Sequence, residues 1–363
     1  MTVQGHSYDD NIGAPAFRNL IINGCMNVAQ RGTSVASITT SGYYTADRFA
    51  TAVATIGTWT QSIENDAPTG SGLRKSLKIL CTTADASPAA GDAFRFRQYI
   101  EGQNVQHIAK GTVSAKQLTL SFWVKSNKIG TYIVELTDND NSRFVSAAYS
   151  ILVSGVWEKK TITFPADSTG VFDNDAELSL MTSFWLGAGS NATSGTLGTV
   201  WASIVEANRA VGQVNLAAAT SNYWQVTGIQ LEVGSVATPF EFEPFETTLR
   251  KCQRYFTRYT DAGSGNFPQS LAHTDLAGRP EITIQYTEKR SDAVAITFSS
   301  AAAISVTNMM TGTAYNSTSL NFYAGYNRFC SNLFIDTGTA APVNVPYLAQ
   351  LRTSAYMDIS AEL

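Results

Sequence analysis

An alternation of apolar and polar residues with a period of two constrains the fold of this chain more than any other feature of its sequence. The clearest run, 117–125, has leucine, phenylalanine or valine at every even position and glutamine, threonine, serine, tryptophan or lysine at the odd ones. Successive side chains of a strand point to opposite faces, so this pattern predicts a strand with one buried face. Helical periodicity is scarce, and the pattern favours an all-β fold.

Runs of this kind recur along the chain, separated by clusters of Gly, Asn, Asp and Ser, as in sandwiches and barrels. About ten precede residue 240, which is enough for two sheets packed as a jelly-roll β-sandwich. The runs are 47–53, 58–63, 74–81, 94–100, 117–125, 131–137, 143–153, 157–165, 178–187 and 222–233.

A short helix and a second β unit are expected after the sandwich. Phe245, Leu249, Cys252 and Phe256 recur at helical spacing after Pro244, a residue that suits a helix start. Strand-like runs resume beyond residue 259. The predicted parts are an N-terminal arm at 1–16, a jelly-roll sandwich at 17–245, a connecting helix at 246–258 and a smaller C-terminal β domain at 259–363.

The composition argues against several classes of protein. Charged residues make up only 15% of the chain and the formal net charge is −4, whereas a nucleic-acid-binding domain needs a basic surface. No run approaches the ~18 apolar residues of a membrane span, and the polar N-terminus has no signal-peptide arrangement. We therefore expect neither a nucleic-acid partner nor a membrane span.

The four cysteines, Cys25, Cys81, Cys252 and Cys330, are widely separated, with no CxxC pair and no neighbouring histidine. This spacing fits neither a metal site nor a redox motif. Each lies in an apolar stretch, so we expect buried free thiols, while a disulfide stays open at this point.

Two groups of residues bracket the predicted sandwich. The first is NLIINGCMNVAQRGTS at 19–34, followed by YTADRF at 44–49. The second is WQVTGIQLEVG at 224–234, followed by ATPFE at 237–241 and CQRYF at 252–256. Together they resemble a family of tail-fibre-like proteins of tailed bacteriophages and prophages. In that family an INGxMxVAQRGTS opening, a DRW or DRF step and a TGVQLEVGxxATPFE close occur in this order.

The resemblance spans about 17–258, and 259–363 resemble no family that we can name. A more distant likeness is to the jelly rolls of carbohydrate-binding modules, many of which open with a similar Asn-Leu-(Ile/Leu)-x-Asn-Gly strand and close on a Leu-Glu-like pair. The first and last strands of such a sandwich commonly lie near each other. This likeness supports the fold and only hints at sugar binding.

Catalysis is not expected from this sequence. His6, His107 and His273 have no neighbouring nucleophile signature such as GxSxG. Capsule-degrading phage spikes usually use long repetitive β-helices, and no such repeat occurs here. A pair of carboxylates for glycoside cleavage stays open, because such pairs form in space. We expect no cofactor.

The oxygen-rich DNDN segment at 138–141 makes Asp138 and Asp140 candidate calcium ligands. The segment lacks the glycine and the terminal glutamate of an EF-hand loop. A hairpin turn between two strands is the favoured interpretation.

Three tryptophans are candidate binding residues. In each of their predicted strands the apolar residues hold the even positions, which places Trp123, Trp157 and Trp185 on the other face. A flat ring on the outer or concave face of a jelly roll suits stacking on sugar rings. Burial in an oligomer or domain interface, where aromatic residues are enriched, and ordinary packing within the domain are the alternatives.

These features, with the resemblance, predict a non-enzymatic virion component of tail-fibre type on the particle surface. It would contact host-surface glycans without cleaving them and would form a homo-oligomer, by analogy a trimer. Weak sites on a repeated protein combine into firm attachment. The arm at 1–16 is either a frayed end or a segment that orders on binding another virion protein. A head-fibre or capsid-decoration protein, a tail adaptor and a carbohydrate-active enzyme are the alternatives.

Overall fold

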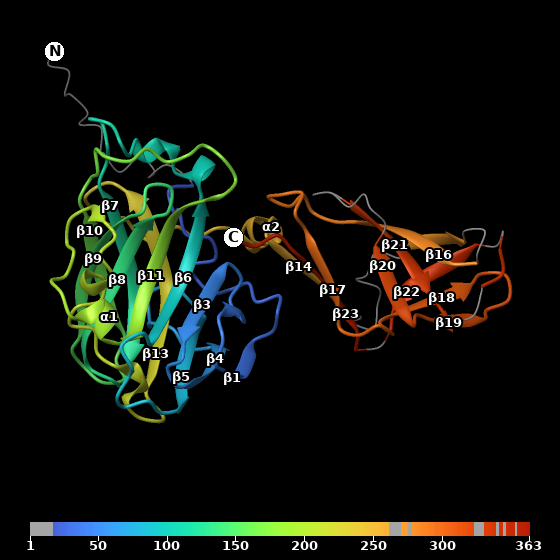
Figure 1. Ribbon diagram of the computed structural model, residues 1–363, viewed down its shortest axis with the longest axis horizontal. Coiled ribbons are helices and arrows are strands. Elements are labelled where there is room, and N and C mark those ends of the chain that lie inside the picture. The colour runs from blue at the N-terminus through green and yellow to red at the C-terminus, as the bar shows by residue number, and fades with distance from the viewer. Residues whose placement is uncertain are drawn as a thin grey trace, which may run out of the picture. The chain divides into compact units, whose positions relative to one another are not determined.

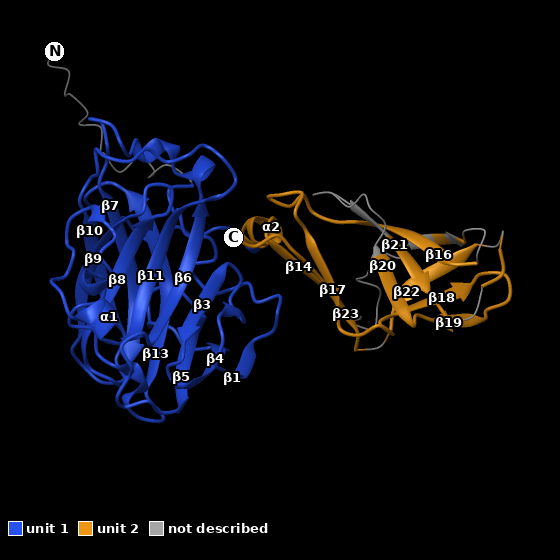
Figure 2. Cartoon of the chain, viewed as in Figure 1, with its two compact units in different colours: residues 1–245 blue, residues 246–363 orange. Residues whose placement is uncertain are grey.

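The computed structural model describes residues 17–260, 270–274, 278–322, 330–338, 341–343, 346–352 and 354–363. The chain divides into two compact units, 1–245 and 246–363 (Figure 2). The predicted N-terminal arm at 1–16 lies outside the described residues. No helix in the described ranges is long and apolar enough to cross a membrane.

The first unit is a jelly-roll β-sandwich of two antiparallel sheets, one behind the other in Figure 1, so the predicted all-β fold is confirmed. In spatial order, the six-stranded sheet holds β1 (Ser34–Ile38), β4 (Thr58–Glu64), β5 (Ser76–Thr83), β13 (Tyr223–Val233), β7 (Leu118–Ser126) and β10 (Glu158–Phe164). The seven-stranded sheet holds β12 (Ala202–Ser203), β9 (Arg143–Ile151), β8 (Gly130–Asp138), β11 (Leu178–Ala188), β6 (Ala93–Glu101), β3 (Phe49–Ala54) and β2 (Gly42–Tyr43).

Short helical segments lie in the connections of the first unit. They are the 3-10 turns η1 (Gly102–Asn104), η2 (Gln106–Ile108), η3 (Glu206–Asn208) and η4 (Leu216–Ala218), and the one-turn helix α1 (Ser190–Thr193).

Aromatic side chains from both sheets fill the core. Phe122 of β7 meets the rings of Tyr149 and Phe184 from the opposite sheet edge-on, with centroids 5.1 Å apart in both pairs. Trp224 of β13 packs against Phe96 at 5.8 Å, and its indole Nε1 donates to the Tyr149 hydroxyl at 3.2 Å. The inward positions of the period-two pattern therefore build this core.

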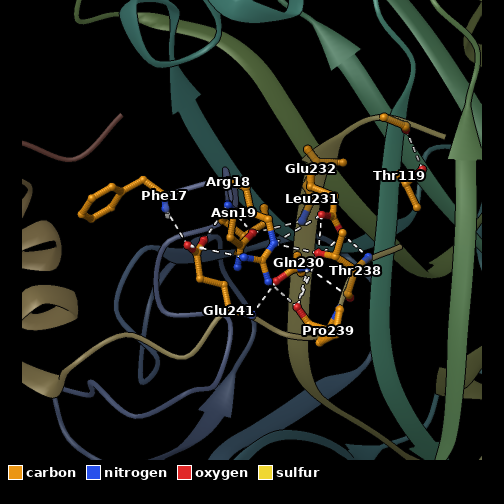
Figure 3. A network of polar contacts seen from close by, with 12 residues as sticks. Phe17, Arg18, Asn19, Thr119, Gln230, Leu231, Glu232, Thr238, Pro239 and Glu241 are labelled. Atoms are coloured by element: carbon orange, nitrogen blue, oxygen red, sulfur yellow. Dashed lines mark hydrogen bonds and ion pairs between the residues drawn. The ribbon is translucent and has the colours of Figure 1, made fainter. Parts of the chain in front are cut away.

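The two motifs that bracket the sandwich in sequence meet in space (Figure 3). The Leu20 amide donates to the Leu231 carbonyl at 2.8 Å, and the Asn19 Oδ1 accepts from the Leu231 amide at 3.1 Å. The Glu241 carboxylate accepts from the backbone amides of Phe17 and Asn19 at 2.5 and 2.9 Å. The opening segment is therefore bonded both to β13 and to the ATPFE segment that follows it.

A buried carboxylate lies at the centre of this contact. Glu232 is only 2% exposed, and its oxygens accept from the Thr238 amide at 2.9 Å and hydroxyl at 2.6 Å. Gln230 Nε2 donates to it at 2.8 Å, and the Arg18 guanidinium lies 3.6 Å away. A buried charge is tolerated when it is paired and hydrogen-bonded, and we name this group of residues, with Glu241, the closing network.

The Asn-Gly pair of the opening motif has a steric role. A Cβ added to Gly24 would lie 2.0 Å from the Ile229 carbonyl oxygen, and the Ile229 amide donates to the Gly24 carbonyl at 3.0 Å. Asn23 has a φ of 62°, and its side-chain amide bonds to the backbone of Val28 at 2.9 and 3.0 Å. These motif residues therefore let the opening turn lie directly against β13.

The second unit is also β-rich. Helix α2 (Phe245–Gln253) stands at the boundary between the units. A three-stranded sheet holds β14 (Phe256–Thr260), β23 (Tyr356–Ser360) and β17 (Ala295–Phe298). A seven-stranded sheet holds β19 (Ala314–Asn316), β18 (Ile304–Asn308), β22 (Tyr347–Leu351), β15 (Ser270–Thr274), β16 (Pro280–Gln285), β21 (Cys330–Asp336) and β20 (Ser319–Phe322).

The short helix ends earlier than its apolar spacing predicts. It stops at Gln253, and Phe256 instead begins β14, where it pairs with Ser360. The pairing with a strand about a hundred residues away overrides the local helical pattern, because long-range contacts routinely outweigh propensity.

Gly24→Ala is expected to lower the free energy of unfolding of the first unit by about 1–3 kcal/mol, because the added methyl group collides with backbone and not with a flexible side chain. Urea unfolding with a far-UV signal measures this change. Gly91→Ala is the matched control, since its added Cβ meets only an Asn191 side-chain nitrogen at 3.9 Å. Equal unfolding midpoints for the two variants would contradict the steric role.

Candidate functional site

Two of the three predicted tryptophans lie on the outer face of the six-stranded sheet. Trp123 is in β7, directly opposite Thr227 of β13 and Lys159 of β10. Trp157 immediately precedes β10, and the Lys125 ammonium lies over its ring, 4.9 Å from the centroid. Both tryptophans are half-buried, so each keeps part of its surface toward solvent.

A break in the strand register makes room for Trp123. The β13–β7 pairing shifts between Thr227 and Gln230, and Gly228 has a φ of 61°. A Cβ at Gly228 would lie 2.8 Å from Leu73 and 3.3 Å from the Trp123 ring. Bulges of this type re-aim side chains at functional surfaces.

Asp66 joins the residues of this face. Its carboxylate accepts from Trp157 Nε1 at 3.2 Å and from Gln225 Nε2 at 3.0 Å, and it forms an ion pair with Lys125. Burial alone would raise the pKa of Asp66, but the bonds from Lys125, Trp157 and Gln225 outweigh it and hold that pKa below its ordinary value. We call Trp123, Trp157, Lys125, Asp66 and Gln225 the tryptophan face.

A second cation lies over a second ring on the same surface. Lys78 of β5 and Lys125 of β7 stand on either side of Gln225 in the strand register. The Lys78 ammonium lies 4.9 Å from the centroid of the Tyr223 ring. The Lys125–Trp157 and Lys78–Tyr223 pairs are both cation–π contacts. The outer surface of this sheet therefore carries two aromatic rings that are each held by a lysine.

A cavity adjoins the tryptophan face. The connection between β4 and β5 lines a space of about 670 Å³, with Asn65, Leu73, Arg74 and Lys75 among its residues. The same connection contains Asp66, whose carbonyl accepts from the Ser76 hydroxyl at 2.5 Å. A volume of this size is in the range of small-molecule sites.

Trp185 lies elsewhere and does not contribute. It is on β11 of the other sheet, is 1% exposed and packs with Ala192 of α1 and Ala210. The chain after β11 covers its ring, so ordinary packing within the domain describes Trp185 and stacking on a sugar does not. The alternation of residues within β11 does not reveal this burial, because the covering residues lie up to 25 positions further along the chain.

The candidate calcium ligands are also engaged within the protein. The Lys110 ammonium lies 2.5 Å from the Asp138 carboxylate and 3.0 Å from Asp167, so a cation of the chain already neutralises Asp138. Asp140 accepts from the Asp173 amide at 3.0 Å. Within the described ranges, no group of three or more His, Cys, Asp or Glu residues is placed to hold a metal ion.

Three of the remaining candidate residues, His107, Cys25 and Cys81, lie within the described part of the chain. His107 lies in η2, where burial and then the charge of Lys116 lower its pKa. Cys25 and Cys81 carry free thiols. His6 and the side chain of His273 lie outside the described residues.

Sequence reasoning did not identify Asp66, Lys78 or Gln225 as site residues. The alternation in β7 indicated part of the site, since Lys125 and Trp123 alternate with the core residues of that strand and so lie on its outer face. Asp66 had no such signal, because it lies in a connection between strands and reaches the face only through the fold.

No family model and no curated sequence matches the chain. Among solved structures, the enzymatically active domain of tailspike protein 4 from bacteriophage CBA120 is similar at 12% identity over 60% of this chain and 21% of that chain, with a TM-score of 0.32. A CBM4 carbohydrate-binding module matches at 12% identity over 58% and 97%, with a TM-score of 0.28. A cyclase from Fischerella sp. TAU matches at 11% identity over 61% and 99%, with a TM-score of 0.33.

The chain thus spans about a fifth of the length of the tailspike chain. Likenesses at these identities and TM-scores carry no argument about function. The likeness to phage tail-fibre-like proteins accordingly stays a resemblance of motifs.

The position of Trp157 is expected to depend on pH through Asp66. Because the pKa of Asp66 in the fold is lowered, the bonds to its carboxylate are fully present above the ordinary carboxyl range and are lost as the pH falls through the folded pKa. Lys125→Met removes the strongest stabilising partner, so the acid transition should move to higher pH. Carboxyl NMR titration of Asp66 measures the shift.

Lys159→Met is the control for this titration, because Lys159 is exposed on the neighbouring strand β10. The assignment of Asp66 as the partner of Lys125 fails if the two methionine variants leave the Asp66 midpoint in the same place.

Proposed function

We propose that this protein is a non-enzymatic structural component of a tailed-bacteriophage virion, of tail-fibre type, displayed on the particle surface. It contacts host-surface glycans through the tryptophan face and does not cleave them. The virion assignment rests on the two bracketing motifs. The binding assignment rests on the geometry of Trp123, Trp157 and Asp66.

The observation that carries the binding assignment is the way Trp157 is held. Its indole nitrogen is bonded to Asp66 and its ring carries the Lys125 ammonium, so the ring is fixed before any ligand arrives. A pre-ordered aromatic side chain loses little conformational freedom on binding. Sugar rings present apolar C–H faces and hydroxyl groups, and this face offers an aromatic surface beside hydrogen-bonding groups.

The same geometry argues against hydrolysis at this face. A general acid for glycoside cleavage needs a carboxyl group with a raised pKa. The pKa of Asp66 is lowered, and its oxygens are bonded to Lys125, Trp157 and Gln225. Asp66 is therefore suited to positioning Trp157 and not to proton donation.

The affinity of one such face is expected to be modest, and attachment would come from repetition. A homo-oligomer, for which we propose a trimer, presents several faces at once, and linked weak sites bind far more firmly than one. The arm at 1–16 would join the oligomer to a neighbouring virion protein.

Trp157→Ala is expected to weaken binding of the purified protein to host cells roughly tenfold per site, the scale of one aromatic contact. Trp123→Ala should act in the same direction. Thr161→Ala is the control, because Thr161 is exposed on the same face. Cell-binding isotherms with dye-labelled protein measure the change, and binding that is unchanged in both tryptophan variants would refute the glycan assignment.

The place on the particle needs a separate experiment. Antibody labelling of intact virions should mark the tail fibres. Labelling confined to the head would instead support a head-fibre or capsid-decoration protein, and labelling of the tail away from its tip would support an adaptor.

A further inference from the structure

Arginines line the outer face of the other sheet. In β6 the outward positions are Arg95, Arg97 and Tyr99, because Phe94, Phe96 and Ile100 point into the core. The register places Arg97 between Ala50 of β3 and Ser183 of β11. We call Arg95, Arg97, Tyr99 and Ser183 the arginine face.

Several polar atoms of this face are buried without a hydrogen-bond partner. They are the Nε atoms of Arg95 and Arg97 and the hydroxyl of Ser183. The Ser183 side chain is 0% exposed. Buried polar groups almost always have a hydrogen-bond partner, and each buried group that lacks one lowers the stability of the fold. The terminal nitrogens of Arg95 and Arg97 are not among these buried atoms, and both side chains are half-buried, so a ligand can reach the ends of the two guanidinium groups.

The carboxylates near this face are already used. Glu135 accepts from Arg209 at 2.6 and 2.8 Å, and Glu206 accepts from the same guanidinium at 2.9 Å. Arg209 therefore bonds both acids, and the three guanidinium groups of Arg95, Arg97 and Arg209 outnumber these two carboxylates by one positive charge.

The excess of positive charge is reflected in the ionisation of Arg95. Burial, followed by the charges of Arg97 and Arg209, lowers the pKa of Arg95 to about 9. A bound anion would reverse this effect by supplying the missing opposite charge.

The surroundings of the arginines suit a sugar ring. On the β3 side, the outward residues Ala50, Ala52 and Ala54 are all small, and their exposure increases along the strand from the buried Ala50 to the exposed Ala54. Tyr99 and Tyr43 lie edge to face at 6.4 Å and are half-buried. The Arg95 guanidinium lies 4.7 Å from the centroid of the Trp185 ring, which stands opposite it on the neighbouring strand β11.

We infer that the arginine face is a second binding site, which takes sugars that carry a carboxylate group. The planar guanidinium fork of an arginine matches a carboxylate in a two-point contact. The tyrosines would contact the ring of the same sugar. The site lies on a different sheet from the tryptophan face, so either site can fail without the other.

The test uses short oligouronates as probes, namely trigalacturonate and trimannuronate, with sialyllactose as a third carboxylate-bearing sugar. The methyl esters of all three sugars are the neutral controls. Isothermal titration should detect binding of at least one acid and none of its ester. Absence of binding by all three acids, or equal binding of an acid and its ester, would overturn the inference.

Arg97→Gln is expected to lower the affinity for the bound acid roughly tenfold or more, and Arg95→Gln should do the same. Arg97→Lys keeps the charge and guards against a folding defect, and it should also lose most of the affinity because it lacks the fork. Arg250→Gln, an exposed arginine on α2, is the matched control and should bind like the parent protein.

Two further arms separate this site from its alternatives. Trp123→Ala should leave acid binding unchanged, since a loss would place the acid on the tryptophan face and overturn the assignment. A sulfated glucan oligosaccharide should bind more weakly than the acid. Binding that is equally strong and equally dependent on Arg97 would show a general anion site and overturn the preference for carboxylates.

Discussion

The sandwich depends on closing its first segment onto its last strand. Glu232 is a charged group inside the fold, and the groups that neutralise and bond it come from Arg18 and Thr238 as well as from its own strand. Glu241 in turn bonds the amides of Phe17 and Asn19. The network is complete only when residues more than two hundred positions apart have met. The start of the first motif and the end of the second are thus used for closure, whereas Gln225 in the second motif bonds Asp66 of the tryptophan face.

Closure leaves the sandwich with two outer faces of different chemistry. On the six-stranded sheet, a carboxylate and two lysines hold aromatic rings in place, and every charge of the tryptophan face has a partner. On the seven-stranded sheet, Arg209 bonds both nearby acids, and the three arginines there carry one positive charge more than those acids balance. The first arrangement favours a neutral ligand with apolar patches, and the second favours an anion. A domain that carried both proposed sites would bind a polysaccharide of mixed composition at two points.

Part of this picture was predictable. The alternation in 117–125 correctly separated the core residues of β7 from Trp123, and strand counting led to the jelly roll. The same reasoning could not distinguish Trp123 from Trp185, because both lie on the outward face of their strands. Only the fold shows that the chain around α1 covers Trp185. It also suggested Asp138 as a calcium ligand, because the run of oxygen-bearing residues does not show that Lys110, 28 residues earlier, forms an ion pair with this carboxylate. Asp66 and the arginine face were missed because their significance lies in the neighbours that they have or lack.

The sequence by itself determined that the chain is β-rich, which face of each regular strand is apolar, and where the sandwich opens and closes. These are local properties, set by side-chain alternation and by turn residues such as Asn23 and Gly24. Only the tertiary structure decided which outward residues reach solvent, which carboxylate meets which cation, and which buried donors are left without an acceptor. Those outcomes depend on contacts between strands that are distant in the chain, such as β5, β13 and β7. The free energy of a charge is set by such neighbours, and no pattern along one strand contains them.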